Sequence, residues 1–338
     1  MTSARRDSRR LPGPGLLESL GWTASYLIAQ ILALAAFMAV FVFVVFGSWP
    51  RNTQAIIDLC LEIDLDRSFV PLGVTNLLCL FVLAPLVRLR LGESAREYLK
   101  IQRPEIGPLI LVIGSILPLA VVSEQLYRWS LDLWAVLSER FPAVAPFANG
   151  NAVELMVQFA RAESFPILIV AVALGPAVGE ELIFRALIGN GLTARFGRAA
   201  GMIVTSLLFA AAHGFPPHAL ATIPIGLYLH HVYLSTGSYW TAVVVHFLNN
   251  LLVITLARYG AVEAIPSSPA LLSCSIGYVL MTAALLSRRA EIATGPAMSS
   301  ERSPFPYAGV LHLRTRLIAA AAVVTFTSAF VWTAFAGS

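Results

Sequence analysis

The chain has 338 residues, of which 57% are hydrophobic and only 12% are charged, and its mean hydropathy is +0.76. These values exclude a water-soluble globular protein, because so few charged side chains cannot cover its surface. They indicate a polytopic membrane protein, whose charges gather at the two faces of the bilayer. The net charge of +4 fits basic internal loops, and we expect no nucleic-acid partner.

The uncharged runs predict the membrane helices, since a helix crosses the hydrocarbon core in about 20 residues. The first three uncharged runs each have the length of a span. The fourth contains Glu180 and Glu181 before the expected helix break at Gly189-Asn190-Gly191. A long stretch without Asp, Glu, Lys or Arg follows, and turn residues divide it into three spans. We predict an all-α fold, a polytopic transmembrane helix bundle of about nine spans: 22–46, 68–87, 106–123, 164–189, 199–213, 217–234, 239–257, 264–287 and 317–338.

The distribution of basic residues predicts the orientation of these spans. With the N-terminus in the cytoplasm, 17 of the 23 basic residues lie in internal segments, as the positive-inside rule requires. The segment 124–164 has two interpretations. It is either a helix that lies along the outer interface or an external loop.

Ionisable side chains inside a membrane are costly, so each of them is a candidate functional residue. Glu180 and Glu181 point about 100° apart on a helix and cannot serve the same point. Glu181 and Arg185 have the spacing i, i+4 and can form an ion pair on one face. Glu180 is then left without a partner on its own face, and we expect it to face a cavity. The alternative is a structural ion pair that locks two helices together.

Two further motifs place histidines on neighbouring spans. Phe209 lies one helical turn before His213, and His246 lies one turn before Asn250. At 1.5 Å per residue, Glu180, His213 and His246 lie about 15, 21 and 10 Å from the inner face. Helix tilt can absorb these differences, so we expect a shared site in the inner half of the membrane. Taken singly, each histidine also fits an interfacial position, and Phe209 fits a core position.

Together and in this order, the motifs EExxxR, FxxxH and HxxxN resemble those of the CPBP family of intramembrane proteases. This family includes the CAAX prenyl endopeptidases and the bacterial Abi or bacteriocin-processing proteins. The resemblance covers residues 165–255, and Ala186 departs from the glycine that many members have after the motif arginine. We expect three parts: N-terminal membrane spans with an interfacial segment (1–160), a catalytic helical core that carries the resemblance (161–260) and C-terminal membrane spans (261–338).

The resemblance also implies a function. It implies an intramembrane endopeptidase that hydrolyses a peptide bond of a membrane-associated protein or lipopeptide with a glutamate-activated water. We expect an integral protein of a bacterial inner (cytoplasmic) membrane, with a membrane protein or lipidated peptide as substrate. The implied residues are Glu180, His213, His246 and Asn250 as catalytic groups, with Glu181, Arg185 and Phe209 in support.

The chemistry of these side chains agrees with peptide hydrolysis, which needs a base for the water and donors for the oxyanion. Glu180 can act as the base, while His213, His246 and Asn250 can hold the water or the oxyanion. No cofactor is favoured, but zinc stays open, because Glu180, His213 and His246 are also a familiar zinc ligand set. The alternative function is a non-proteolytic membrane transporter or immunity factor that uses the buried Glu/His cluster for binding or proton relay.

Overall fold

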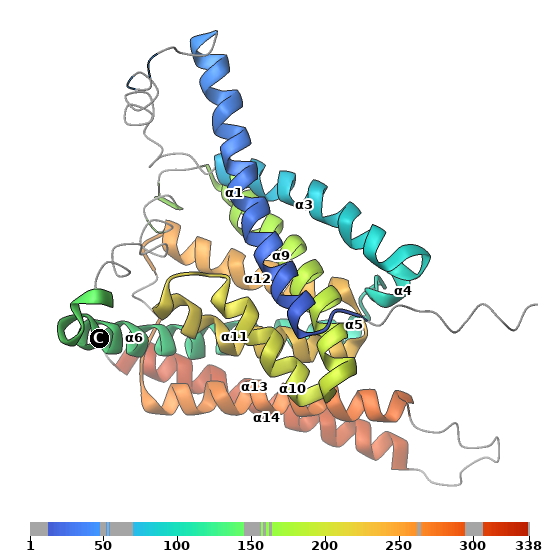
Figure 1. The fold of residues 1–338 in the computed structure, drawn as a ribbon. Coiled ribbons are helices and arrows are strands. Elements are labelled where there is room, and N and C mark those ends of the chain that lie inside the picture. Colours follow the sequence, from blue (N-terminus) through green and yellow to red (C-terminus); the bar gives the residue numbers. More distant parts are fainter. Residues whose placement is uncertain are drawn as a thin grey trace, which may run out of the picture.

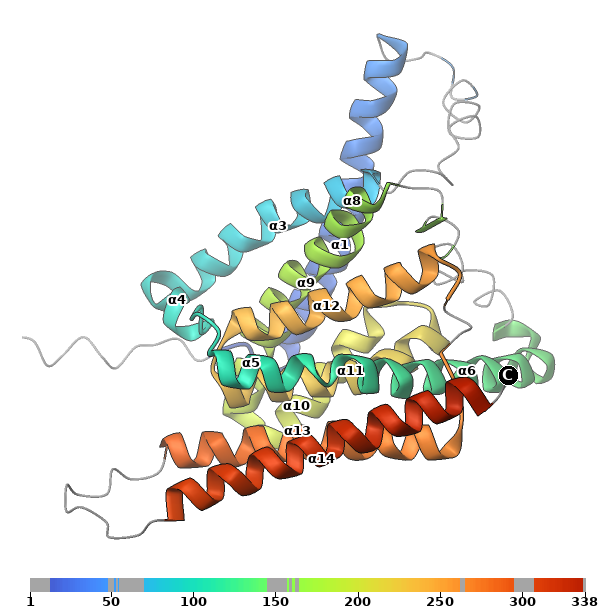
Figure 2. The same cartoon turned by 180° about the vertical axis from the view of Figure 1, so that it is seen from behind.

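The computed structural model describes residues 13–47, 70–144, 164–261, 265–294 and 307–336, with a few single residues between them. All regular secondary structure in these ranges is helical, which confirms the predicted all-α class. Figures 1 and 2 show the helices from opposite sides. Their bounds are α1 (Leu16–Phe46), α3 (Val70–Leu91), η2 (Gly92–Ser94), α4 (Ala95–Tyr98), α5 (Ile106–Ile113), α6 (Ile116–Arg140), α8 (Phe165–Leu168), η4 (Ile169–Leu174), α9 (Gly175–Glu180), η5 (Glu181–Gly189), α10 (Asn190–Ala211), α11 (Pro216–Thr236), α12 (Tyr239–Arg258), α13 (Pro269–Thr294) and α14 (Tyr307–Ala336).

Several of these helices are long and apolar enough to cross a membrane, which agrees with a polytopic membrane helix bundle. A shorter apolar helical segment, Ala320–Ala334, lies in α14. The total of nine spans stays a prediction. Among the described residues, six stretches meet the length and composition of a span: Leu16–Val44, Gly73–Tyr98, Ile106–Arg140, Phe165–Ala211, Tyr239–Arg258 and Pro269–Ala290.

The expected break at Gly189-Asn190-Gly191 is wrong. The helix continues through these residues, and the backbone leaves helical geometry at Gly197, with φ 80° and ψ 168°, where a glycine has no steric penalty. Gly189 and Gly191 serve close packing instead. A Cβ atom on Gly189 would lie 2.2 Å from Cε1 of His230, and one on Gly191 would lie 2.4 Å from the carbonyl oxygen of Pro14.

The segment that follows the third expected span begins as a helix. α6 continues to Arg140, so an external loop over residues 124–140 is wrong. No proline or glycine interrupts residues 119–140, and Glu124 pairs with Arg128 one turn later at 2.8 Å. Residues 145–156 of the same segment lie outside the described residues.

The acidic motif lies on a helical stretch that other helices enclose. α11 packs against α6, α10, α12 and α13, and α14 lies against α13 (Figure 1). On another side of the bundle α1 pairs with α3; α1 contacts η5, and α3 contacts α9. α12 contacts both α9 and η5, so the α9–η5 stretch is packed between the α1–α3 pair and α12.

Segments that we predict to be internal meet at one end of the bundle. The backbone N–H of Tyr239 donates to the carbonyl of Lys100 at 3.0 Å, and the hydroxyl of Ser238 donates to the carbonyl of Gln102 at 2.8 Å. Arg289 of α13 forms an ion pair with Glu105. These bonds join the 99–105 connection to the start of α12 and to α13. That this end faces the cytoplasm stays a prediction.

Candidate active site

The acidic motif begins where α9 passes into a π-helix, η5. A second π-helix, η4, precedes α9, and Pro176 stands in the first turn of α9. Proline has no N–H, so Pro176 cannot donate to the carbonyl of Val172 four residues earlier. The side-chain amide of Asn250 on α12 donates to that carbonyl at 3.3 Å. All nine residues of η5 are buried, and π-turns of this kind are frequent at functional sites.

Glu181 and Arg185 form the ion pair that their spacing predicts. Nη1 of Arg185 lies 3.1 Å from Oε1 of Glu181, and both side chains are buried. Nδ1 of His246 lies 2.8 Å from the same oxygen. Because a carboxylate oxygen only accepts, Nδ1 carries the proton of this bond, and Nε2 of a neutral His246 is an acceptor. Glu181 therefore sets the tautomer of His246.

Glu180 is the more accessible of the two carboxylates, with 14% of its side chain exposed against 0% for Glu181. Its Oε2 lies 3.8 Å from Nε2 of His246. Its Oε1 accepts a hydrogen bond of 3.3 Å from the hydroxyl of Tyr26 on α1. Glu180 thus has a partner on α1, which the expectation of no partner on its own helix face did not cover. A small pocket beside this contact, between α1, α3 and α9, is lined in part by Tyr26 and Gly179.

The ring of Phe209 lies at the centre of the site. The guanidinium carbon of Arg185 lies 3.9 Å from the ring centroid, which is a cation–π contact. The rings of Phe184, His213 and His246 meet the same ring edge to face, with centroid distances of 5.4, 4.8 and 6.1 Å. Phe209 is buried, so one aromatic side chain links all three motifs. The expectation that the three motifs meet is confirmed.

His213 lies just after the end of α10. Its Nδ1 is 2.9 Å from the carbonyl oxygen of Phe209, so Nδ1 carries a proton. Nε2 of a neutral His213 is then an acceptor, and the ring donates to an oxyanion only after it is protonated. The ring of His218 lies against it, with a centroid distance of 4.9 Å. Nothing in the spacing of the motifs points to His218.

Asn250 lies one turn after His246, but its amide is directed toward η4. Its neighbour Asn249 is buried and donates to Oδ1 of Asn250 at 3.5 Å. Oδ1 of Asn249 has no hydrogen-bond partner among the described residues. Asn249 has no place in the HxxxN motif, and its only sequence signal is that it is a second amide directly before Asn250.

The residues of the alternative zinc site do not form a ligand cluster. In the part of the chain that the structure describes, no group of three or more His, Cys, Asp or Glu side chains is arranged to hold a metal ion. Nε2 of His246 lies near Glu180, whereas His213 bonds a backbone carbonyl through Nδ1 and packs its ring on Phe209. A zinc site made of Glu180, His213 and His246 is therefore not supported.

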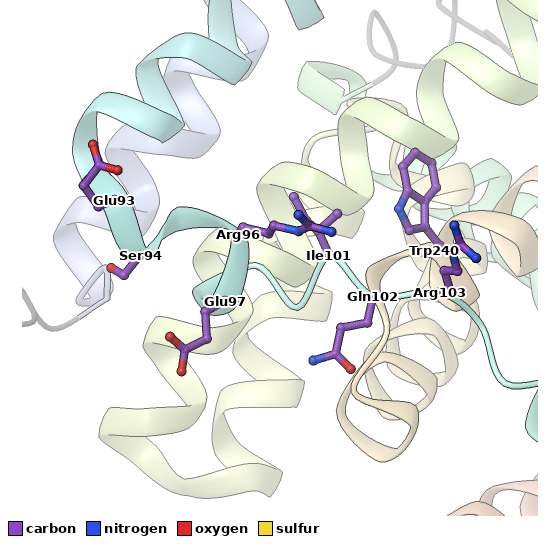
Figure 3. A pocket seen from close by; sticks show the side chains of 8 residues that line it. All are labelled: Glu93, Ser94, Arg96, Glu97, Ile101, Gln102, Arg103 and Trp240. Carbon is purple, nitrogen blue, oxygen red and sulfur yellow. The ribbon is translucent and has the colours of Figure 1, made fainter.

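A separate cleft of about 760 Å³ opens near the 99–105 connection and the start of α12. Figure 3 shows Arg96 reaching toward Ile101, with Arg103 beside Trp240. None of its lining residues belongs to the three motifs, so this larger space is not the motif site itself. The lining residues are Glu93, Ser94, Arg96, Glu97, Ile101, Gln102, Arg103 and Trp240.

Part of the chain is similar to a known protein family. The family model described as type II CAAX prenyl endopeptidase Rce1-like matches residues 162–252. This range contains all three motifs, and the match confirms the resemblance to the CPBP and CAAX protease family. The matched family is one of membrane proteases, and α1, α3, α13 and α14 lie outside the match. No curated protein and no solved structure matches the chain.

Proposed function

We propose that this protein is an intramembrane endopeptidase in which Glu180 activates the attacking water. The observation that carries this proposal is the position of His246 between two acidic side chains. Its Nδ1 is bonded to Glu181, and its Nε2 faces Oε2 of Glu180 at 3.8 Å. The match of residues 162–252 to a membrane-protease family supports the same class of reaction.

Glu180 and His246 present two acceptor atoms that one water molecule can reach. Oε2 of an ionised Glu180 and Nε2 of a neutral His246 are both acceptors, so they share no hydrogen. A water beside the two atoms can donate one hydrogen to each and turn a lone pair toward a peptide carbonyl. Glu180 takes a proton as the water oxygen bonds to the carbonyl carbon. When the C–N bond breaks, the protonated Glu180 returns that proton to the leaving nitrogen.

The remaining motif residues have supporting roles in this proposal. Glu181 and Arg185 hold His246 in one tautomer, and Phe209 packs against Arg185 and both histidines. We assign the oxyanion to Asn250, whose amide has a second N–H besides the one directed to Val172. Neutral His213 offers an acceptor, which suits an N–H of the bound peptide.

The substrate in this proposal is a membrane protein or a lipidated peptide. The apolar helices make the chain an integral membrane protein, so its substrate shares the bilayer with the site. We infer that the membrane is the inner membrane of a bacterium, as the resemblance to the bacterial Abi proteins implies.

Mapping of new protein termini tests this function. Membranes of cells that express the wild type, Glu180→Gln or Glu139→Gln are digested, and peptide termini are compared by mass spectrometry. Glu139 is exposed and lies at the far end of α6, so its variant controls for expression and for loss of a carboxylate. We expect one or more termini that appear with the wild type and Glu139→Gln but not with Glu180→Gln. Identical termini in all three samples would favour the alternative of a binding or proton-relay protein.

A further inference from the structure

Tyr26 of α1 contacts the proposed catalytic base from outside the matched region. Its hydroxyl donates to Oε1 of Glu180 at 3.3 Å, across 154 positions of sequence. The match begins at residue 162, so the three motifs say nothing about α1. Among the described residues, this is the one hydrogen bond that the side chain of Glu180 receives from another side chain.

The bond determines how the carboxylate of Glu180 is turned. The terminal torsion of a glutamate is broad, so either oxygen can face a given direction unless one of them is held. Tyr26 holds Oε1, and Oε2 then faces Nε2 of His246. The oxygen that takes the proton from water is therefore the one that Tyr26 leaves free.

The ring of Tyr26 is itself fixed in place. It is buried, and it meets the ring of Phe184 edge to face, with a centroid distance of 5.7 Å. Phe184 belongs to η5, the same π-helix that carries Glu181. Tyr26 thus packs against η5 and also bonds Glu180, the residue that directly precedes η5.

The N-terminal end of α1 is anchored to the rest of the bundle. Glu18 forms a two-point ion pair with Arg90 of α3, with distances of 2.6 and 3.0 Å. Arg195 donates to the carbonyl of Gly13 at 3.0 Å. Tyr26 lies eight residues after Glu18, about 12 Å along the helix, so this anchor sets its height beside Glu180.

From these contacts we infer that Tyr26 is a positioning residue for Glu180, and that α1 is part of the catalytic unit. This inference rests on the proposed peptidase function. In this role Tyr26 acts through Glu180, whose Oε1 its hydroxyl holds. It acts by keeping Oε2 of Glu180 directed at the water that His246 also holds.

The test uses Tyr26→Phe in the full chain in proteoliposomes. The probe is a synthetic lipid-anchored peptide that spans the Glu180-dependent terminus found by mass spectrometry. Tyr98→Phe is the matched control, because its hydroxyl also donates at 3.3 Å, but to the backbone carbonyl of Leu187. A hydrogen bond to a charged group corresponds to about tenfold or more in rate. We expect kcat of Tyr26→Phe to fall by about that factor with KM unchanged, and Tyr98→Phe to keep the wild-type kcat.

Two further variants separate positioning from general damage. Glu180→Asp draws the carboxylate back from Tyr26, so adding Tyr26→Phe to it should leave its residual rate unchanged. Glu18→Arg breaks the anchor and should lower kcat, whereas the swapped pair Glu18→Arg with Arg90→Glu should restore it. This swap tests the role of α1 even if Tyr26→Phe folds poorly.

The outcomes distinguish this inference from the function on which it rests. If the wild type cleaves the peptide and Tyr26→Phe cleaves it with the same kcat, Tyr26 has no positioning role and the peptidase function stands. An equal loss from Tyr26→Phe in the wild-type and Glu180→Asp backgrounds also contradicts the inference. If no cleavage depends on Glu180, the proposed function is wrong, and the role of Tyr26 is wrong with it.

Discussion

Nδ1 of His246 lies 2.8 Å from Oε1 of Glu181, although the two residues are 65 positions apart and belong to different helices. The bond joins α12 to the π-helix η5 inside the bundle, where both side chains are buried. It holds the imidazole so that Nε2 points toward Glu180. The two neighbouring carboxylates thus have different tasks, one fixing the histidine and the other facing the water.

The first prediction follows from this division of tasks. Glu181→Gln leaves Arg185 buried without a full charge partner and weakens the hold on His246. We expect it to lower the free energy of unfolding by about 3 to 5 kcal/mol, as breaking a buried ion pair does. Glu180→Gln keeps an acceptor for Tyr26 and should change stability little while it abolishes cleavage. Unfolding in detergent micelles, measured for both variants, checks the contrast, and equal stability losses would contradict it.

The second prediction concerns the carbonyl of Val172. Asn250→Ala removes the amide that donates to it, and we expect a loss of about 1 kcal/mol. Pro176→Ala supplies a backbone N–H that can donate to the same carbonyl. Asn250→Ala should therefore cost less stability in the Pro176→Ala background than in the wild type. A double-mutant cycle of melting temperatures checks this. If Asn250→Ala lowers the stability equally in both backgrounds, the predicted coupling between Asn250 and Pro176 is wrong.

The third prediction concerns close packing at Gly189. A methyl group there would lie 2.2 Å from Cε1 of His230, so Gly189→Ala should destabilise the protein by about 1 to 3 kcal/mol. Gly277→Ala is the matched control, because a Cβ at Gly277 of α13 meets nothing within 4 Å. The control should be neutral or slightly stabilising. If the Gly189→Ala protein is as stable as the control, the ring of His230 moves aside without loss of stability, and the prediction is wrong.

The fourth prediction tests the orientation. In a background in which Cys60, Cys79 and Cys274 are replaced by serine, Arg96→Cys should resist an impermeant thiol reagent in intact cells. Phe141→Cys, exposed just after α6, should react. The reverse labelling pattern would mean that the positive-inside rule misleads for this chain.

Local features of the site could be predicted from the sequence, because helical spacing alone determines them. The ion pair of Glu181 and Arg185 is an example, since four residues on one helix bring the two side chains together. The meeting of the three motifs could also be predicted, because each span fixes the depth of its motif in the membrane.

Contacts between distant helices could not be predicted in this way. The bond from Tyr26 to Glu180 depends on where α1 crosses η5, and the spacing of residues in the sequence does not determine that position. The helix break that we predicted at Gly189 and Gly191 was wrong for a related reason. In a membrane bundle a glycine allows close helix contact, and only tertiary structure distinguishes Gly189, which packs on His230, from Gly197, which breaks the helix.

The central claim is that Glu180 activates water for peptide cleavage without a zinc ion held by Glu180, His213 and His246. The most direct measurement is the rate at which the chelator-treated wild type and Glu180→Gln cleave the lipid-anchored peptide in proteoliposomes. We predict full activity of the wild type after chelation and none from Glu180→Gln. Cleavage by Glu180→Gln at the wild-type rate, or loss of wild-type activity that added zinc restores, would contradict the claim.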